Sequence, residues 1–89
     1  MLIKTESGSS YKITGGICRK YNDQGLCIDA FKVISMKSVP NEGINTFKDV
    51  FDLPQSKPEI GKRIHIAGFD SDWLSTLVVS IEYGEDDER

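Results

Sequence analysis

The side chains best suited to catalysis are one histidine, His65, and two cysteines, Cys18 and Cys27. A nucleophile needs a base within hydrogen-bond reach and a third group that orients the base. His65 alternates with Ile64 and Ile66, so the pattern predicts a strand residue that points outward from the core. No nucleophile elbow or other catalytic motif accompanies these residues. The sequence therefore predicts a protein that is not an enzyme.

Metal and nucleotide sites have little support in the sequence. The carboxylates of Asp70 and Asp72 could grip a hard cation, but Asp and Ser also stabilise turns by bonding to the local backbone. Two cysteines nine residues apart and one distant histidine lack the paired spacing of a zinc site. Gly15 and Gly16 are not followed by the Lys and Ser or Thr of a phosphate-binding loop. We expect neither a metal nor a cofactor.

A single-stranded nucleic acid is one ligand class that the sequence can accommodate, because small β barrels stack bases on aromatic rings flanked by cations. The candidate residues are Arg19, Lys20, Tyr21 and Lys32. The net charge of −3 and the pI of about 5.0 oppose this interpretation. Residues 1–69 hold ten Lys and Arg against seven acids, a charge of +3, whereas residues 70–89 hold one Arg against seven acids, a charge of −6. Such an acidic end would repel phosphates.

A protein partner is the broader hypothesis, because exposed apolar side chains on an insertion or a strand edge can dock on another chain. The candidate contacts are Phe47, Val50, Phe51 and Trp73. In a domain this small the same side chains could instead complete the protein's own core. Self-association through an open sheet edge is a further form of the hypothesis, since a dimer would cover that edge.

Residues 2–14 are predicted to form a β-hairpin with the two-residue turn Ser7-Gly8. In that register Leu2 lies opposite Ile13, so one face would collect Leu2, Tyr11 and Ile13 for the core.

Residues 17–34 are predicted to form a second hairpin around the loop Asn22-Asp23-Gln24-Gly25, whose Asn and Gly suit a type I turn followed by a left-handed residue. If Gly25 forms a bulge, Cys18 and Cys27 lie on opposite sides of the sheet. A plain two-residue turn would place both thiols on one face. Free thiols are favoured, because two cysteines in a chain without an export signal are usually small buried side chains.

Residues 36–58 are expected to be a long connection that contains all three prolines. Within it Thr46 and Asp49 have the spacing of a capping box, with Asp in place of the usual Glu or Gln. A short helix over about 46–52 would bury three side chains at helical spacing, Phe47, Val50 and Phe51. Strands near residues 60–66 and 74–83 would follow. In the last strand one face is expected to carry Leu77, Val79, Ile81 and Tyr83, and the other Val78, Ser80 and Glu82.

Five to six short strands with one helix in a long connection predict a mainly β fold, a small antiparallel barrel or rolled sheet of the SH3-like or OB-like kind. Residues 1–84 would form a single domain, and residues 85–89 a disordered acidic tail. The longest apolar runs have three residues, too few to span a membrane, and the first residues lack the pattern of an export signal. A cytoplasmic location is therefore expected.

Three segments resemble short β proteins of bacteriophages and prophages: Thr5-x-Ser7-Gly8-Ser9-Ser10-Tyr11, Gly61-Lys62-Arg63-Ile64 and Ser75-Thr76-Leu77-Val78-Val79-Ser80-Ile81. The resemblance covers the two ends of the chain, and it implies a phage accessory protein in the host cytoplasm without known catalytic residues. The leading hypothesis is thus a non-enzymatic accessory protein that binds, and in one version inhibits, a host or phage protein. Single-stranded nucleic-acid binding is the alternative.

Overall fold

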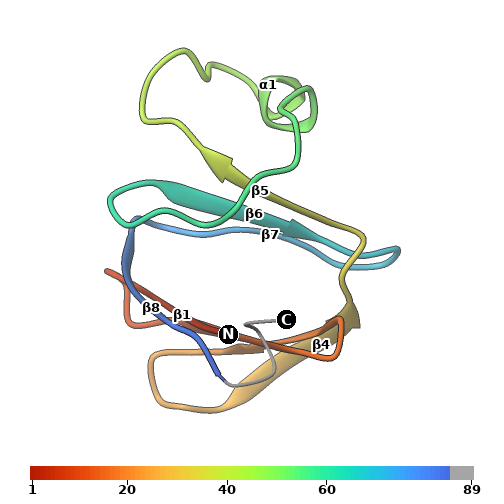
Figure 1. Cartoon of the computed structure of the whole chain (residues 1–89), viewed down its shortest axis with the longest axis vertical. Coiled ribbons are helices and arrows are strands. Elements are labelled where there is room, and N and C mark those ends of the chain that lie inside the picture. Colours follow the sequence, from red (N-terminus) through yellow and green to blue (C-terminus); the bar gives the residue numbers. More distant parts are fainter. Residues whose placement is uncertain (85–89) are drawn as a thin grey trace.

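The computed structural model describes residues 1–84 as two antiparallel sheets that face each other, with one short helix outside them (Figure 1). The elements are β1 (Leu2–Thr5), β2 (Ser10–Thr14), β3 (Ile17–Tyr21), β4 (Cys27–Lys32), β5 (Ser35–Val39), α1 (Phe47–Phe51), β6 (Arg63–Ala67), β7 (Asp72–Leu74) and β8 (Val78–Glu82). One sheet has the order β4-β3-β2-β1-β8 and the other β5-β6-β7. The prediction of a mainly β, rolled antiparallel sheet is confirmed. The predicted acidic tail, residues 85–89, lies outside the described residues.

The β1–β2 hairpin turns over five residues, Thr5-Glu6-Ser7-Gly8-Ser9, and not over the predicted two. The Gly8 N–H donates to the Thr5 carbonyl and the Thr5 N–H donates to the Ser9 carbonyl, both at 3.0 Å. Gly8 has a φ of +90°, a left-handed conformation that glycine adopts at little steric cost. Gly8 is therefore the bulge residue that follows the turn.

This turn moves the predicted register by one residue, which exchanges the two faces of β1. Ile3 lies opposite Tyr11 and is fully buried, whereas Leu2 lies opposite Lys12 on the outer face. The prediction that Leu2 belongs to the core face is wrong, while Tyr11 and Ile13 are buried as expected.

The β3–β4 hairpin closes through the same kind of turn, as predicted for its Asn and Gly. The Gly25 N–H donates to the Asn22 carbonyl at 3.0 Å, and the Asn22 N–H donates to the Leu26 carbonyl at 2.9 Å. Gly25 has a φ of +81°. The thiols are free, with Cys18 buried and Cys27 exposed, which confirms the bulged alternative and its separation of the two thiols.

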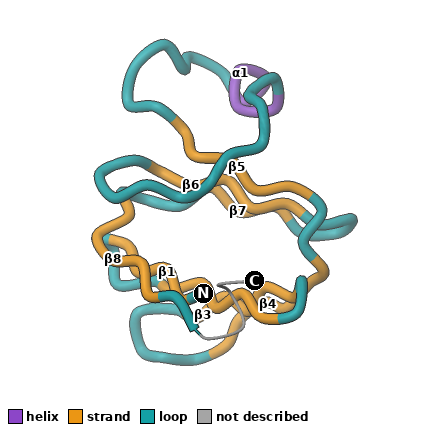
Figure 2. Tube along the Cα trace, in the orientation of Figure 1, coloured by secondary structure: helices purple, strands orange, loops and turns teal. Residues whose placement is uncertain are grey.

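Two stretches of chain pass from one sheet to the other at opposite sides of the molecule, as Figure 2 shows. One runs from β4 into β5, where the Val33 N–H donates to Gly16 and the Ile34 N–H donates to Ala67, both at 2.8 Å. The other runs from β7 into β8 through residues 75–77. The eight strands thus come from six continuous runs of chain, two of which are divided where the sheet rolls over.

Four of the five residues of β5 lie in the segment 36–58, which the sequence suggests is a connection. Its pattern is hidden because both of its faces are covered. Met36 packs against the core between the sheets, whereas Lys37 and Val39 are buried on the opposite face, beneath the α1 segment. A buried lysine gives no apolar alternation, so a search for period-two hydrophobicity passes over this strand.

The predicted face of the last strand is wrong at Val79. The register of β8 against β1 shifts by one residue, which leaves Val79 unpaired as a bulge. Val78 is buried and Ile81 packs on the core, whereas the Val79 side chain is half exposed. Because of the bulge, Val78 and Ile81 both face the core, although strict alternation would place them on opposite faces.

The main core lies between the two sheets and consists of Ile3, Tyr11, Ile13, Cys18, Ile64, Ile66 and Val78. Larger side chains, including Phe31 and Trp73, pack at its margin. The turn between β6 and β7 closes tightly over β4. A Cβ on Gly68 would lie 2.7 Å from the Lys32 carbonyl oxygen and from the Phe31 ring, so this position admits glycine alone without a shift.

Helix α1 begins where the capping box predicts. The Asp49 N–H donates to the Thr46 hydroxyl at 3.3 Å, and the Thr46 N–H donates to the Asp49 carboxylate at 2.9 Å. The N–H groups of Asn45 and Thr46 hold the pKa of Asp49 below its ordinary 3.8. At the other end the Lys37 ammonium donates to the last two helical carbonyls, at 3.3 and 2.6 Å. Within residues 1–84 no helix has the length and apolarity needed to cross a membrane.

Candidate functional site

The outer face of the five-stranded sheet carries one exposed cation on each of four neighbouring strands. They are Lys4 in β1, Lys12 in β2, Arg19 in β3 and Lys32 in β4, called here the cationic track. Successive residues of a strand point to opposite faces, and the neighbours of these cations point inward. The alternation that builds the core therefore also places the four cations together on the outside.

The strand register arranges the cationic track obliquely across the sheet. Lys12 lies directly opposite Arg19. Lys4 is displaced by two residues toward one end of the strands, and Lys32 by two residues toward the other end. Since neighbouring strands lie about 4.8 Å apart and strand residues about 3.4 Å apart, the track is about 20 Å long.

Within residues 1–84 the cations of the track have no acidic partner. No carboxylate of residues 1–84 forms an ion pair with any of them. Among the described strands, the acid on this face is Glu82, which lies at the sheet edge opposite Leu2. Like charges directly opposite each other on antiparallel strands are destabilising, so the Lys12–Arg19 pair costs stability. A bound anion would relieve that repulsion.

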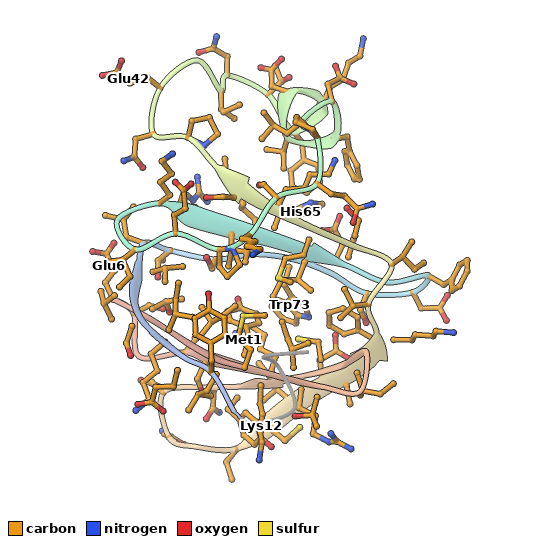
Figure 3. All side chains as sticks on the ribbon, viewed as in Figure 1. Met1, Glu6, Lys12, Glu42, His65 and Trp73 are labelled. Atoms are coloured by element: carbon orange, nitrogen blue, oxygen red, sulfur yellow. The ribbon has the colours of Figure 1, made fainter. Side chains whose placement is uncertain are left out.

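Aromatic and apolar side chains flank the cationic track. Tyr21 lies two residues beyond Arg19 on the same face of β3 and is partly exposed, as are Leu2 and Ile17. Figure 3 places Lys12 beneath the five-stranded sheet and Glu42, in the segment before α1, at the opposite end of the molecule. A protein of negative net charge thus presents one locally positive face.

Lys20, which the sequence groups with Arg19 and Tyr21, lies on the inner side of the sheet. Its exposed fraction is 5%, and its ammonium lies 4.6 Å from the centre of the Trp73 ring and 5.1 Å from that of Tyr11. These cation–π contacts satisfy the buried charge between the two sheets. Lys20 therefore contributes to the interior and is not part of the cationic track.

Trp73 is also a largely interior residue. Its indole N–H donates to the Asp29 carboxylate at 2.7 Å, joining β7 to β4, and this bond is the main cause that lowers the pKa of Asp29 below 3.8. Burial raises the pKa of Tyr11 to about 12 and that of Cys18 to about 12. Both groups stay protonated at neutral pH, so the Cys18 thiol is not a nucleophile in the folded protein.

A second cluster covers the outer face of the three-stranded sheet. The Phe47 and Phe51 rings of α1 lie 5.1 Å apart, centre to centre, and 5.8 and 5.4 Å from the His65 ring of β6; the three residues form the aromatic cap. Val50 is buried beneath the helix, whereas both phenylalanines are about half exposed, at 50% and 52%. Of the four candidate contact residues, the cap thus brings two to the surface side by side.

His65 points away from the core, as its alternation predicts, but it is completely buried by the aromatic cap. The expectation of a histidine at the surface is wrong because a helix from a distant part of the sequence covers the strand. Its Nε2 is hydrogen-bonded to the Asp72 carboxylate, and its Nδ1 has no partner among the described residues. Nor do three His, Cys, Asp or Glu side chains of residues 1–84 come together as metal ligands. The imidazole has the surroundings of a packing residue.

Two hollows lie elsewhere on the described surface. One of about 200 Å³ lies beside the aromatic cap and is lined in part by Thr46, Val50 and Leu74. The other, of about 280 Å³, is lined in part by Met1, Met36 and Pro58. The described linings of both contain no histidine, cysteine or carboxylate.

Sequence reasoning identified part of the cationic track. Arg19, Tyr21 and Lys32 share the outer face as one group, and Lys12, whose neighbours Tyr11 and Ile13 are predicted to be buried, is expected on the same face. Lys4 was missed, because the predicted register of the first hairpin places it opposite Tyr11 on the core face, and its alternation with buried Ile3 and Thr5 is the signal that could have found it. Comparison with protein-family models, curated proteins and solved structures finds no match.

Proposed function

We propose that this protein is a non-enzymatic binding protein whose cationic track holds a nucleic acid. The observation that carries the proposal is the directly opposed Lys12–Arg19 pair, extended at both ends by Lys4 and Lys32 and without an acidic partner in residues 1–84. When the phosphates of a nucleic acid bind along such a row of cations, the counterions of the phosphates are released into solution. This release is the main source of affinity for nucleic acids.

The distribution of charge supports one orientation of binding. The outer face of the five-stranded sheet carries the four cations of the track, whereas residues 40–62, around α1, carry four acids and three lysines and so have little net charge. An approaching polyanion is therefore attracted most strongly to the face that carries the track. The resemblance to phage and prophage proteins adds the proposal that the protein is an accessory factor in the cytoplasm of a bacterial host.

The proposal is tested by the fluorescence anisotropy of a labelled 20-nucleotide oligonucleotide at several salt concentrations. Four phosphate contacts predict that affinity falls roughly 50-fold between 50 and 200 mM salt, a log–log slope of about −3. Arg19→Ala should lessen that slope by about 0.7. The matched control is Lys57→Ala, because Lys57 is exposed but lies outside the sheet face. No binding, or a slope near zero, would refute the proposal.

A second candidate function is protein binding through the aromatic cap, and a specific observation favours it. Phe47 and Phe51 are half exposed and in contact with each other, so together they offer an apolar surface on the most protruding part of the molecule (Figure 1). Aromatic side chains in such a cluster are typical anchors of protein interfaces.

This candidate is tested by capture from nuclease-treated bacterial lysate with matched variants. Phe47→Ser should lose a stoichiometric partner that the unaltered protein and Phe69→Ser both retain. Phe69 is the matched control because it is 87% exposed in the β6–β7 turn, away from the cap. Loss of the partner in both variants, or in neither, would contradict a role for the cap.

A further inference from the structure

We infer that the ligand of the cationic track is a single strand of nucleic acid, lying obliquely across β1 to β4 with a base against Tyr21. The inference rests on the proposed function and names the form of nucleic acid that the same face selects. It is carried by three features of the face: its width, the direction of the track and the position of Tyr21.

The width of the face excludes insertion into a duplex groove. The major groove of DNA is about 12 Å wide and admits one helix or a two-stranded ribbon. Four strands already span about 14 Å between their outer backbones, and β8 extends the sheet beyond β1. α1, the helix of the described chain, lies on the far side of the molecule (Figure 1). A duplex would therefore contact this face only through the outermost phosphates of its backbone.

The direction of the track suits a flexible strand. The cations advance in one oblique line, with Lys12 and Arg19 about 5 Å apart and each outer lysine about 7–8 Å from its neighbour by strand geometry. A single strand can bend to follow a twisted sheet and bring successive phosphates to all four cations. A stiff duplex, whose phosphates follow a fixed helix, meets fewer of them.

Tyr21 supplies the contact that a duplex cannot use. Its partly exposed ring lies beside Arg19 on the face, so a base unstacked from its neighbours can lie on the ring while the adjacent phosphate meets the guanidinium. Partly exposed Leu2 and Ile17 extend the apolar surface on the side of the track opposite Tyr21. In a duplex the bases are stacked on one another and their faces are not accessible.

The test compares a 12-nucleotide single strand with the same sequence annealed to its complement, both at 50 mM salt. We expect the single strand to bind at least tenfold more tightly. Tyr21→Leu should weaken single-strand binding about fivefold to 150-fold, leave duplex binding unchanged and keep the unfolding temperature. Tyr21→Phe, which preserves the ring, should retain the affinity.

The outcomes separate this inference from the proposed function. Equal affinity for single strand and duplex, or equal weakening of both by Tyr21→Leu, would overturn the inference and leave nucleic-acid binding in place. Binding of neither ligand would overturn both. A loss of affinity in Tyr21→Phe as large as that in Tyr21→Leu would show that the hydroxyl, and not the ring, makes the contact, which also overturns the stacking arrangement.

Discussion

Reversing the charge of Lys12 should stabilise the protein and weaken its binding at the same time. In Lys12→Glu the repulsion across β2 and β3 becomes an attraction between Glu and Arg19, whose positions are directly opposed. A substitution that removes a structural residue lowers both stability and affinity. Opposite signs are expected only where a repulsive arrangement is tolerated in the free protein and relieved by a ligand.

The size of the stability change follows from the register. Direct cross-strand pairs contribute about 0.2–1 kcal/mol each, and the substitution both removes an unfavourable pair and forms a favourable one. Solvent screening of exposed charges reduces the sum, so we expect a gain of about 1 kcal/mol in the free energy of unfolding. For a domain of this size that gain raises the unfolding temperature by roughly 4–8 °C.

The assay is thermal unfolding followed by circular dichroism at 20 mM and 1 M salt, together with oligonucleotide binding. The gain should shrink at high salt, where the screening length is about 3 Å. Binding should weaken, and the slope of log affinity against log salt should lessen by about 0.7 for the lost phosphate contact. Lys57→Glu changes the net charge equally away from the track and should alter neither property in this way.

Two results would refute the reasoning separately. An unchanged or lower unfolding temperature in Lys12→Glu would mean that the side chains of Lys12 and Arg19 avoid each other and that the pair is not repulsive. A higher unfolding temperature with unchanged oligonucleotide affinity would mean that the repulsion is real but the track does not bind nucleic acid.

Three further predictions concern the interior and the helix. The exposed thiol of Cys27 should react with an aromatic disulfide reagent in the native protein, whereas Cys18, buried and with its pKa raised to about 12, should react only on unfolding; equal rates would contradict the burial. The fluorescence of Trp73 should change as acid protonates Asp29, with a midpoint below pH 3.8, because the hydrogen bond from the indole lowers the pKa of that carboxyl. The stability that this bond contributes is present above the midpoint and is lost as the pH falls through it. A midpoint above pH 3.8, or the same fluorescence change in Asp29→Asn, would contradict the assignment. Thr46→Ala should lower the free energy of unfolding by about 0.5–2 kcal/mol in urea titrations, and no change would mean that α1 contributes nothing to the cooperative unit.

Local chemistry made much of the fold predictable from sequence. The Asn and Gly of the second hairpin specified a turn that leaves one residue in a left-handed conformation, and the spacing of Thr46 and Asp49 specified the start of a helix. These signals depend on backbone geometry over four or five residues, which any tertiary setting must respect. The opposite placement of the two cysteines followed from the same turn.

The first hairpin shows where local reasoning fails. A Ser-Gly pair fits either a two-residue turn or the end of a five-residue turn, and the two alternatives differ by one residue of register. That single residue decides whether Leu2 or Ile3 enters the core, and whether Lys4 faces the core or the outer surface. The bulge at Val79 shifts the last strand in the same way.

Alternation within strands and the spacing of turn and capping residues by themselves determined that this chain forms a rolled β sheet with one capped helix, because those signals are local. The tertiary structure alone decided which polar side chains are buried and which face water. Lys20 is held by rings from two other strands, and Lys37 by helical carbonyls 13 and 14 residues away. His65 is buried by the aromatic cap, and the Trp73 bond to Asp29 spans 44 residues. Whether a charged or polar side chain faces water depends on which distant segments of the chain pack over it. The residue pattern within one strand does not specify those contacts.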